Sequence, residues 1–564
     1  MNSKIGTELN VALDTPEYLR EKSLELNTGY DSEFNSWSLI IRYIGDLSEI
    51  AVDYNAVYTE LLGGFAIILV PEFEVFDFAI DNRVIYIEKP KLFVQQRATI
   101  NGFVQSCMSV PYFDKGLRGS GVTVAIIDSG IDIFHEEFIA INDDSDINTS
   151  KIIGLWDQSL FGNPPKGYNM GTYFDNNDIN DAINKTERKF DSNDVSGHGT
   201  AVAGIVSACT PDVNLLIVKL ATGNNEQVNT ANLMMAIDFV VRYSIDRNVP
   251  LVINLSYGNN SGDHNGNSVL ERYIDAVSLL SRVTFVVGAG NDAAAGRHVQ
   301  INMEHENIYK HDFQISVGEG SINIQVWRDF QDQVDVLLST PSGETLGPFN
   351  DFEQLMSYSV NDMDIRVLNS GPSPINTRQE TYISIIPVGD FIESGVWSIR
   401  LIPQGIVDGR VDIWLPVEGS TNTNIFFLNP SESTTITIPS TSESVITVGA
   451  YDSNNMSYAA FSGRGYTVDG NIKPDIVAPG VNIDAPRVGG GYSLVTGTSF
   501  ATPFVSSASA MLMEYGIVLG NDLFLYGEKV KAYLISGANT LPAIKDFPDL
   551  LIGWGTLCVE ESLP

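Results

Sequence analysis

Apolar runs and amphipathic stretches alternate along the chain from about residue 122 to residue 290. The runs VTVAIID, VNLLIVKL, LVINLSYG and VTFVVGAG are almost uninterrupted, and the stretches between them carry apolar residues at helical spacing. Continuous apolar strands separated by helices are typical of a parallel sheet that helices cover on both faces. The pattern therefore predicts an α/β domain in which a ligand binds at the carboxyl ends of the strands.

Two other segments have different patterns. Residues 36–93 alternate between strand, helix and strand, which predicts a small α+β unit. Between about 305 and 440 many short alternating runs are separated by Gly, Pro and Ser, which predicts a jelly-roll-like β-sandwich. The α/β pattern resumes after this sandwich. The expected parts are an N-terminal unit at 1–96, two halves of the α/β domain at 97–304 and 441–564, and an inserted sandwich at 305–440.

Charge and hydropathy exclude two classes of partner. The 564 residues include 33 Lys and Arg but 70 Asp and Glu, which gives a net charge of -37. Such a charge repels phosphate backbones, so nucleic acid is not expected as a partner. The sequence has no run of 18 or more apolar residues, and its start lacks the apolar core of a signal peptide. We therefore expect no membrane insertion, and synthesis in the cytoplasm without a signal peptide.

Three short motifs carry residues suited to nucleophilic catalysis. Asp128 ends an apolar strand in AIIDSGID, His198 opens a small-residue helix in GHGTAVAG, and Ser499 begins a helix in GTSFATP. A carboxylate that orients an imidazole, which in turn activates a hydroxyl, is the arrangement of a serine hydrolase. Each motif alone has a simpler explanation, namely a turn aspartate, a structural histidine or an N-cap serine. Their joint occurrence favours catalysis.

In the order Asp, His, Ser the three motifs resemble those of the subtilisin-like proteases, or subtilases. The resemblance implies a serine endopeptidase on a subtilisin-like fold, with Asp128, His198 and Ser499 as the triad. It also implies that Asn291, in VGAGN, donates a hydrogen bond to the oxyanion. Ser256, Tyr257 and Gly258 match the strand edge that pairs with an extended peptide substrate. No cofactor is implied, and no metal site is assigned because CTPDVN runs straight into LLIVKL without the usual calcium-binding loop.

The order of the parts most resembles that of the clostridial Csp spore germination proteases. This resemblance implies that residues 1–96 are a prodomain, an intramolecular chaperone that is cut off between Gln96 and Arg97 and stays bound as an inhibitor. Phe93 then lies four positions before the cut, where subtilases accept a large apolar side chain. An uncut linker is the alternative. The resemblance further implies a spore-associated protein that activates a cortex-lytic enzyme zymogen by limited proteolysis during germination.

A second function class is a non-catalytic one. In that case the chain is a protease-derived scaffold, inhibited by its own prodomain, that serves as a binding or signalling module. The intact set of Asp128, His198 and Ser499 favours the enzyme, because a pure scaffold needs none of these groups.

Overall fold

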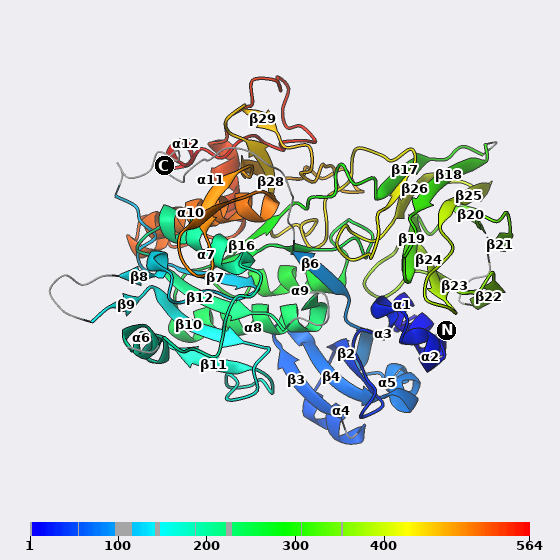
Figure 1. The fold of residues 1–564 in the computed structure, drawn as a ribbon, viewed down its shortest axis with the longest axis horizontal. Coiled ribbons are helices and arrows are strands. Elements are labelled where there is room, and N and C mark those ends of the chain that lie inside the picture. The colour runs from blue at the N-terminus through cyan, green and yellow to red at the C-terminus, as the bar shows by residue number, and fades with distance from the viewer. Residues whose placement is uncertain are drawn as a thin grey trace.

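The structure is a computed structural model that describes residues 3–54, 56–95, 116–140, 147–185, 188–221, 228–305, 307–350 and 354–563. Figure 1 shows three parts: an α/β domain on the left, a β-sandwich on the right, and a smaller unit between and below them. This is the subtilisin-like α/β fold that the sequence predicts, with an N-terminal unit and a strand-rich insertion.

The α/β domain is built on a largely parallel sheet with strand order β11-β10-β12-β7-β14-β16-β28-β29, in which β30 also pairs with β28. Each central strand is a continuous apolar run and is buried along its whole length, as both faces of the sheet are covered. The strands are β7 (Thr123–Asp128), β10 (Ile152–Asp157), β11 (Thr172–Asp175), β12 (Asn214–Lys219), β14 (Leu251–Leu255), β16 (Val283–Gly288), β28 (Ile446–Asp452), β29 (Ser457–Tyr458) and β30 (Ile476–Pro479).

Helices pack on both faces of this sheet, and alternate residues of each strand contact opposite sets. In β7, Val124 and Ile126 belong to the core that includes helices α7 and α10, whereas Ala125 and Ile127 belong to the core that includes α8 and α9. The helices are α6 (Asn176–Asn184), α7 (His198–Cys209), α8 (Thr230–Arg247), α9 (Val269–Ser278), α10 (Thr498–Met513), α11 (Glu528–Ser536) and α12 (Val559–Ser562). Short two-stranded pairs join β8 (Ile139–Ala140) to β9 (Thr149–Ser150) and β31 (Ile483–Pro486) to β32 (Tyr492–Val495).

The N-terminal unit is an antiparallel sheet with order β1-β2-β4-β3, with β5 also paired to β2. Helices cover one face, and the other face turns toward α8 and α9, as the cluster joining Phe65 to Tyr273 indicates. Its elements are α1 (Thr7–Asp14), α2 (Glu17–Arg20), α3 (Leu24–Asn27), β1 (Tyr30–Asp31), β2 (Ser36–Tyr43), α4 (Leu47–Asp53), β3 (Val57–Leu61), β4 (Phe65–Pro71), α5 (Val75–Ile80) and β5 (Val84–Glu88).

The insertion consists of two antiparallel sheets, ordered β17-β26-β19-β24-β23-β22 and β21-β20-β25-β18-β27, which enclose a core of their own. Its first strand begins at His298 and pairs with β26, so the sandwich starts before residue 305, the boundary that the sequence predicts. The strands are β17 (His298–Asn302), β18 (Tyr309–Ile315), β19 (Ile322–Arg328), β20 (Gln333–Ser339), β21 (Thr345–Phe349), β22 (Leu355–Val360), β23 (Met363–Ser370), β24 (Gln379–Pro387), β25 (Gly395–Gly405), β26 (Arg410–Trp414) and β27 (Ile425–Phe427).

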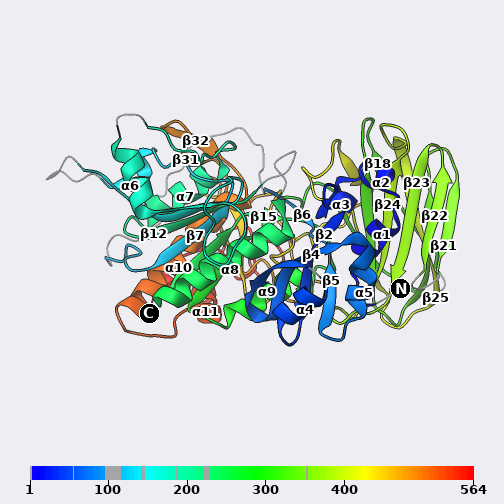
Figure 2. The same ribbon diagram turned by 90° about the horizontal axis from the view of Figure 1, so that it is seen from below.

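The N-terminal unit contacts both of the other parts, and Figure 2 shows it between the α/β domain and the sandwich. Its hydrophobic core continues into the sandwich, since Leu368, Tyr382 and Ile386 are buried among its side chains. Arg366 of the sandwich also pairs with Asp14 at 3.1 Å. The insertion therefore packs on the N-terminal unit as well as on the α/β domain.

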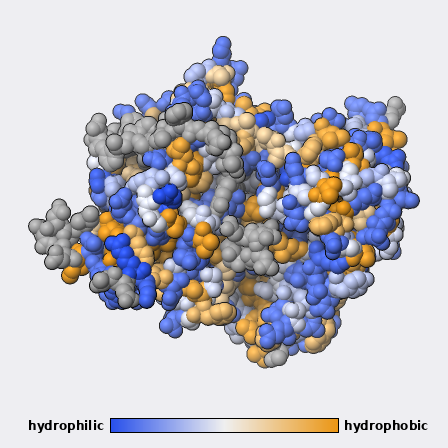
Figure 3. Space-filling view, viewed as in Figure 1, coloured by the Kyte–Doolittle hydropathy of each residue, from blue (hydrophilic) through white to orange (hydrophobic). Residues whose placement is uncertain are grey.

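Hydrophilic and hydrophobic residues are interspersed over the face drawn in Figure 3. Among the helices within the described ranges, none combines the length and the apolar character needed to cross a membrane.

Candidate active site

The first two motifs meet at the carboxyl end of the central strand. β7 ends at Asp128, and α7 begins at His198, whose Nδ1 lies 2.8 Å from Asp128 Oδ1. Both side chains are fully buried. An ionised carboxylate only accepts hydrogen bonds, so the imidazole donates from Nδ1 and keeps Nε2 as its acceptor nitrogen. The pair is therefore arranged as an oriented general base.

Gly199 explains how the helix comes so close to this strand. A Cβ atom at Gly199 would lie 2.2 Å from the Gly130 carbonyl oxygen and 3.1 Å from Asp128 Cβ. Any side chain would push α7 away from the strand, and His198 would move with it. The glycine after the histidine is thus required by the packing that places the imidazole.

Asp194, which belongs to none of the sequence motifs, supports this contact. It is buried, and its carboxylate accepts from Ser129 Oγ at 2.8 Å, Gly197 N at 2.9 Å and Thr200 N at 2.8 Å. It thereby ties the turn after Asp128 to the first turn of α7. The only sequence signal is an aspartate four residues before His198, which is too far from the helix for an N-cap, the position that Gly197 occupies.

Ser499 is the second residue of α10, at the end where backbone N–H groups are not used within the helix. Its Oγ lies 3.5 Å from the carbonyl oxygen of Ser256, and Ser256 Oγ lies 3.4 Å from the Ser499 carbonyl oxygen. The ring of Phe500 packs against the His198 imidazole at 5.1 Å between centroids. The start of α10 is thus held against both the histidine and the strand edge.

Asn291 follows β16 and is oriented by the residue before Ser499. Its Oδ1 accepts from Thr498 N at 3.0 Å and from Thr498 Oγ1 at 3.1 Å. The amide oxygen is therefore engaged, which leaves Nδ2 as a buried donor with no hydrogen-bond partner among the described residues. Burial raises the pKa of the neighbouring Asp292 to about 6.

The end of the N-terminal unit forms a strand, β6 (Leu92–Gln95), that lies between two short edge strands. On one side it pairs antiparallel with β15 (Tyr257–Gly258), with Gln95 opposite Tyr257 and Val94 opposite Gly258. On the other side Phe93 is opposite Val228 of β13 (Val228–Asn229), an edge that the sequence analysis did not identify. An extended segment held by two edges is bound as a substrate would be.

The far end of β6 reaches the candidate catalytic groups. Gln95 Nε2 donates to the Tyr257 hydroxyl at 3.0 Å and lies 3.5 Å from Asp128 Oδ1. Phe93 is buried in the core beneath the cleft. Gln96 and Arg97, between which the sequence predicts a cut, lie outside the described residues.

A hydroxyl at a helix start, an oriented imidazole and an amide donor constitute the parts needed for acyl transfer at a peptide carbonyl. Within the chain segments that the structure describes, no group of three or more His, Cys, Asp or Glu side chains is placed to hold a metal ion.

Comparisons with known proteins match both main parts. The model of the subtilase family matches residues 119–322 and 405–555, and the model of the Csp protease B prodomain matches residues 3–91. The stretch left between the two subtilase matches lies within the sandwich. A solved structure of the Clostridium perfringens CspB protease is 34% identical, with a TM-score of 0.73 over 80% of this chain and 95% of that chain.

Curated relatives are similar over shorter shares of their length. The serine protease AprX of Bacillus subtilis is 37% identical over 153 residues, which are 24% of this chain and 33% of the relative. The PIII-type proteinase of Lactococcus lactis subsp. cremoris is 24% identical over 478 residues, which are 73% of this chain and 23% of the relative. The chain thus spans about a third or less of the length of these two relatives.

Proposed function

Because the chain belongs to the subtilase family of serine proteases, we propose that it cleaves peptide bonds with Asp128, His198 and Ser499 as its triad. The observation that carries this assignment is the buried contact of 2.8 Å between His198 Nδ1 and Asp128 Oδ1, beside the helix whose second residue is Ser499. That contact leaves Nε2 of the imidazole to take a proton.

In the proposed mechanism, Ser499 Oγ attacks the peptide carbonyl while His198 Nε2 accepts its proton. Asp128 holds the ring in the required tautomer and stabilises the imidazolium. The oxyanion receives hydrogen bonds from Asn291 Nδ2 and from the Ser499 backbone N–H. The leaving amine takes the proton from His198, and water activated by the same ring then hydrolyses the acyl-enzyme.

We further propose that the first bond cut is the one between Gln96 and Arg97 and that the prodomain stays bound afterwards. Support comes from β6, which occupies the cleft as an extended strand and ends at Gln95 against Tyr257. The prodomain also keeps its contacts with α8, α9 and the sandwich after such a cut. A prodomain held in this way acts as an inhibitor.

The proposed protein substrate is a cortex-lytic enzyme zymogen, activated during spore germination. This finer assignment is supported by the match to the Csp protease B prodomain and by the likeness to the C. perfringens CspB protease. Purified protein incubated with such a zymogen should shorten it at one site, and the Ser499→Ala variant should leave it intact. Intact zymogen with both proteins would contradict the assignment.

A serine-reactive fluorophosphonate distinguishes this enzyme from a non-catalytic scaffold. Labelling of Ser499 only after proteolytic removal of the prodomain would show a masked enzyme, whereas no labelling in either state would support the scaffold. N-terminal sequencing tests the cut independently. A second start at or near Arg97 in the wild type, missing in Ser499→Ala, is expected, and Met1 alone in both would reject it.

A further inference from the structure

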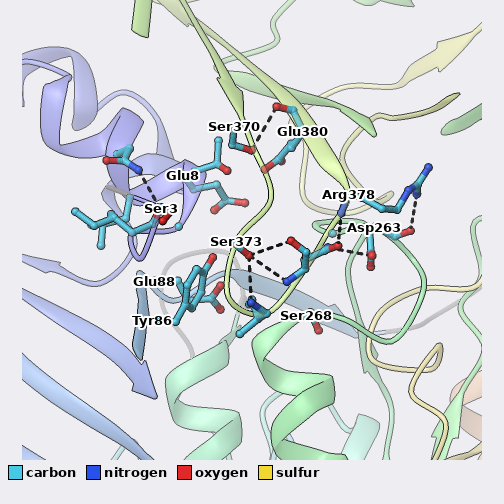
Figure 4. Close-up of a pocket in the computed structure, with 18 of the residues that line it drawn as sticks. Ser3, Glu8, Tyr86, Glu88, Asp263, Ser268, Ser370, Ser373, Arg378 and Glu380 are labelled. Carbon is cyan, nitrogen blue, oxygen red and sulfur yellow. Dashed lines mark hydrogen bonds between the residues drawn. The ribbon is translucent and has the colours of Figure 1, made fainter. Parts of the chain in front are cut away.

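A cavity of about 90 Å³ lies where the prodomain, the α/β domain and the sandwich meet, away from the triad. Figure 4 shows Glu8, Glu88 and Glu380 extending toward this space from different elements. Glu8 lies on α1, Glu88 ends β5, and Glu380 lies on β24 of the sandwich. All three are at most 5% exposed. The cavity is therefore lined by buried carboxyl groups from the prodomain and the sandwich, and the α/β domain completes its wall.

The segment Lys91–Gln95, which we call the tail, enters the catalytic cleft and places a cation in this cavity. Lys91 directly precedes β6, and its backbone is held by Thr230, which donates from N to the Lys91 carbonyl at 2.9 Å and accepts from Lys91 N at 3.0 Å. Its ammonium group lies 3.4 Å from the Ser261 carbonyl oxygen and 3.9 Å from Glu88 Oε2. Lys91 lines the cavity together with Glu380.

Electrostatics link this ammonium group to the carboxylates. Burial lowers the pKa of Lys91, but Glu88, Glu8, Glu380 and Glu25 outweigh burial and raise its pKa overall. Burial raises the pKa of Glu380 to about 7, and Lys91 is the group that opposes this increase most strongly. The sandwich carboxyl group and the tail ammonium group thus favour each other's charged form.

When another peptide replaces the tail, some of the carboxyl groups around Lys91 leave with the prodomain and others stay. Glu8, Glu25 and Glu88 belong to the prodomain and leave with it. Asp263 stays, but its Oδ2 already accepts from Asn267 at 2.8 Å and Asn376 at 3.0 Å. Glu380 and the Ser261 carbonyl oxygen remain to receive a cation.

We propose that Glu380 and the Ser261 carbonyl form a distal subsite that selects lysine or arginine at the sixth residue before the cleaved bond. This inference rests on the proposed function, because it counts from a cut after Gln96. The sandwich then contributes to substrate selection, although the catalytic groups lie elsewhere. The free space beside Lys91 accommodates the larger guanidinium group of arginine.

Self-processing of the full chain tests the subsite. Lys91→Met should slow the cut by about tenfold, because the buried carboxyl loses its cation, whereas Lys91→Arg should keep the wild-type rate. Glu380→Gln should slow the cut of the wild-type chain to a similar extent and should slow Lys91→Met no further. A Glu380→Gln variant that is cut at the wild-type rate would overturn the proposal.

Asp14→Asn is the matched control, since it removes another charge contact between the prodomain and the sandwich, at Arg366. It should leave the rate unchanged. Unfolding of each variant in the Ser499→Ala background separates slow cutting from failure to fold. If Lys91→Met and Asp14→Asn slow the cut equally, the contact only holds the prodomain, and the proposal is wrong.

Processed enzyme freed of the prodomain provides a second readout through peptides ending in LFVQQ before the cut. Lysine before LFVQQ should raise kcat/KM about tenfold over glutamine, and Glu380→Gln should abolish the difference between the two peptides. Equal values for both peptides would overturn the proposal. If neither the wild type nor any variant showed Ser499-dependent cutting with any peptide, the proposed function itself would be refuted.

Discussion

The two ends of one tail segment meet very different surroundings. Along Leu92–Gln95 the cleft binds mainly through backbone pairing with β15 and β13, which any extended sequence can make. At Lys91 the tail inserts a buried charge among carboxyl groups. Backbone pairing tolerates changes of sequence, whereas a buried charge must be matched because an unpaired one is costly. The cleft therefore supplies reactivity, and the cavity around Lys91, which we call the junction, supplies discrimination between substrates.

The largest effect is expected at the catalytic end. Ser499→Ala deletes one oxygen at the start of α10 and should reduce peptide cleavage and self-processing by about 10⁴-fold or more, with the fold retained. The processed fraction on a denaturing gel, together with circular dichroism, measures both. Normal maturation of this variant in a purified system would show that the triad is assigned wrongly.

Asn291→Ala should lower kcat by about 10²–10³ with little change in KM, because its amide acts mainly on the charge that develops in the transition state. Steady-state kinetics with a peptide substrate give both constants. An unchanged kcat would remove Asn291 from the mechanism.

Asp194→Asn should act through position alone. The substitution turns one carboxylate oxygen into an amide donor, although that oxygen accepts a hydrogen bond from Ser129, Gly197 or Thr200. The change should cost about 2–3 kcal/mol of stability. We also expect a lower kcat, because the first turn of α7 carries His198. Urea unfolding and kinetics on the same sample test this; a destabilised variant with full kcat would limit Asp194 to stability.

The junction should make stability depend on pH. The carboxyl of Glu380 has a pKa of about 7 in the folded chain against 4.5 for an ordinary glutamate. A raised folded pKa means that its stabilising contribution is complete below pH 4.5 and is lost as pH rises through about 7. Glu380→Gln should reduce that loss by about 1 kcal/mol, measured by urea unfolding of Ser499→Ala protein from pH 5 to 8. Identical pH profiles for the variant and its parent would show that Glu380 does not titrate in this range.

The smallest effect is expected at the rim of the junction. Asp14 is 60% exposed and pairs with Arg366 at 3.1 Å, so Asp14→Asn should change stability by no more than about 0.5 kcal/mol. The same urea experiment at two salt concentrations measures it. A larger change would mean that the junction depends on charge even where solvent reaches it.

Local patterns predicted the α/β domain well, because a parallel sheet covered on both faces needs continuous apolar strands such as VTVAIID. Ser256, Tyr257 and Gly258 were expected to form an edge for an extended peptide, and in the structure Tyr257 and Gly258 pair with β6. Asp194 was missed, since an aspartate in the loop before a helix belongs to no motif of its own. The edge strand β13 was missed because it has only two residues, too few to show an alternating strand pattern.

The sequence by itself determined the candidate groups of the cleft, since Asp128, His198 and Ser499 each stand at a strand end or helix start that their own motif indicates. Only the tertiary structure decided the junction. Glu8, Lys91 and Glu380 come from segments far apart in the chain, and each looks like an ordinary surface charge in the sequence. These charges interact strongly because they are buried between domains, where water is removed. No local sequence pattern indicates that kind of burial.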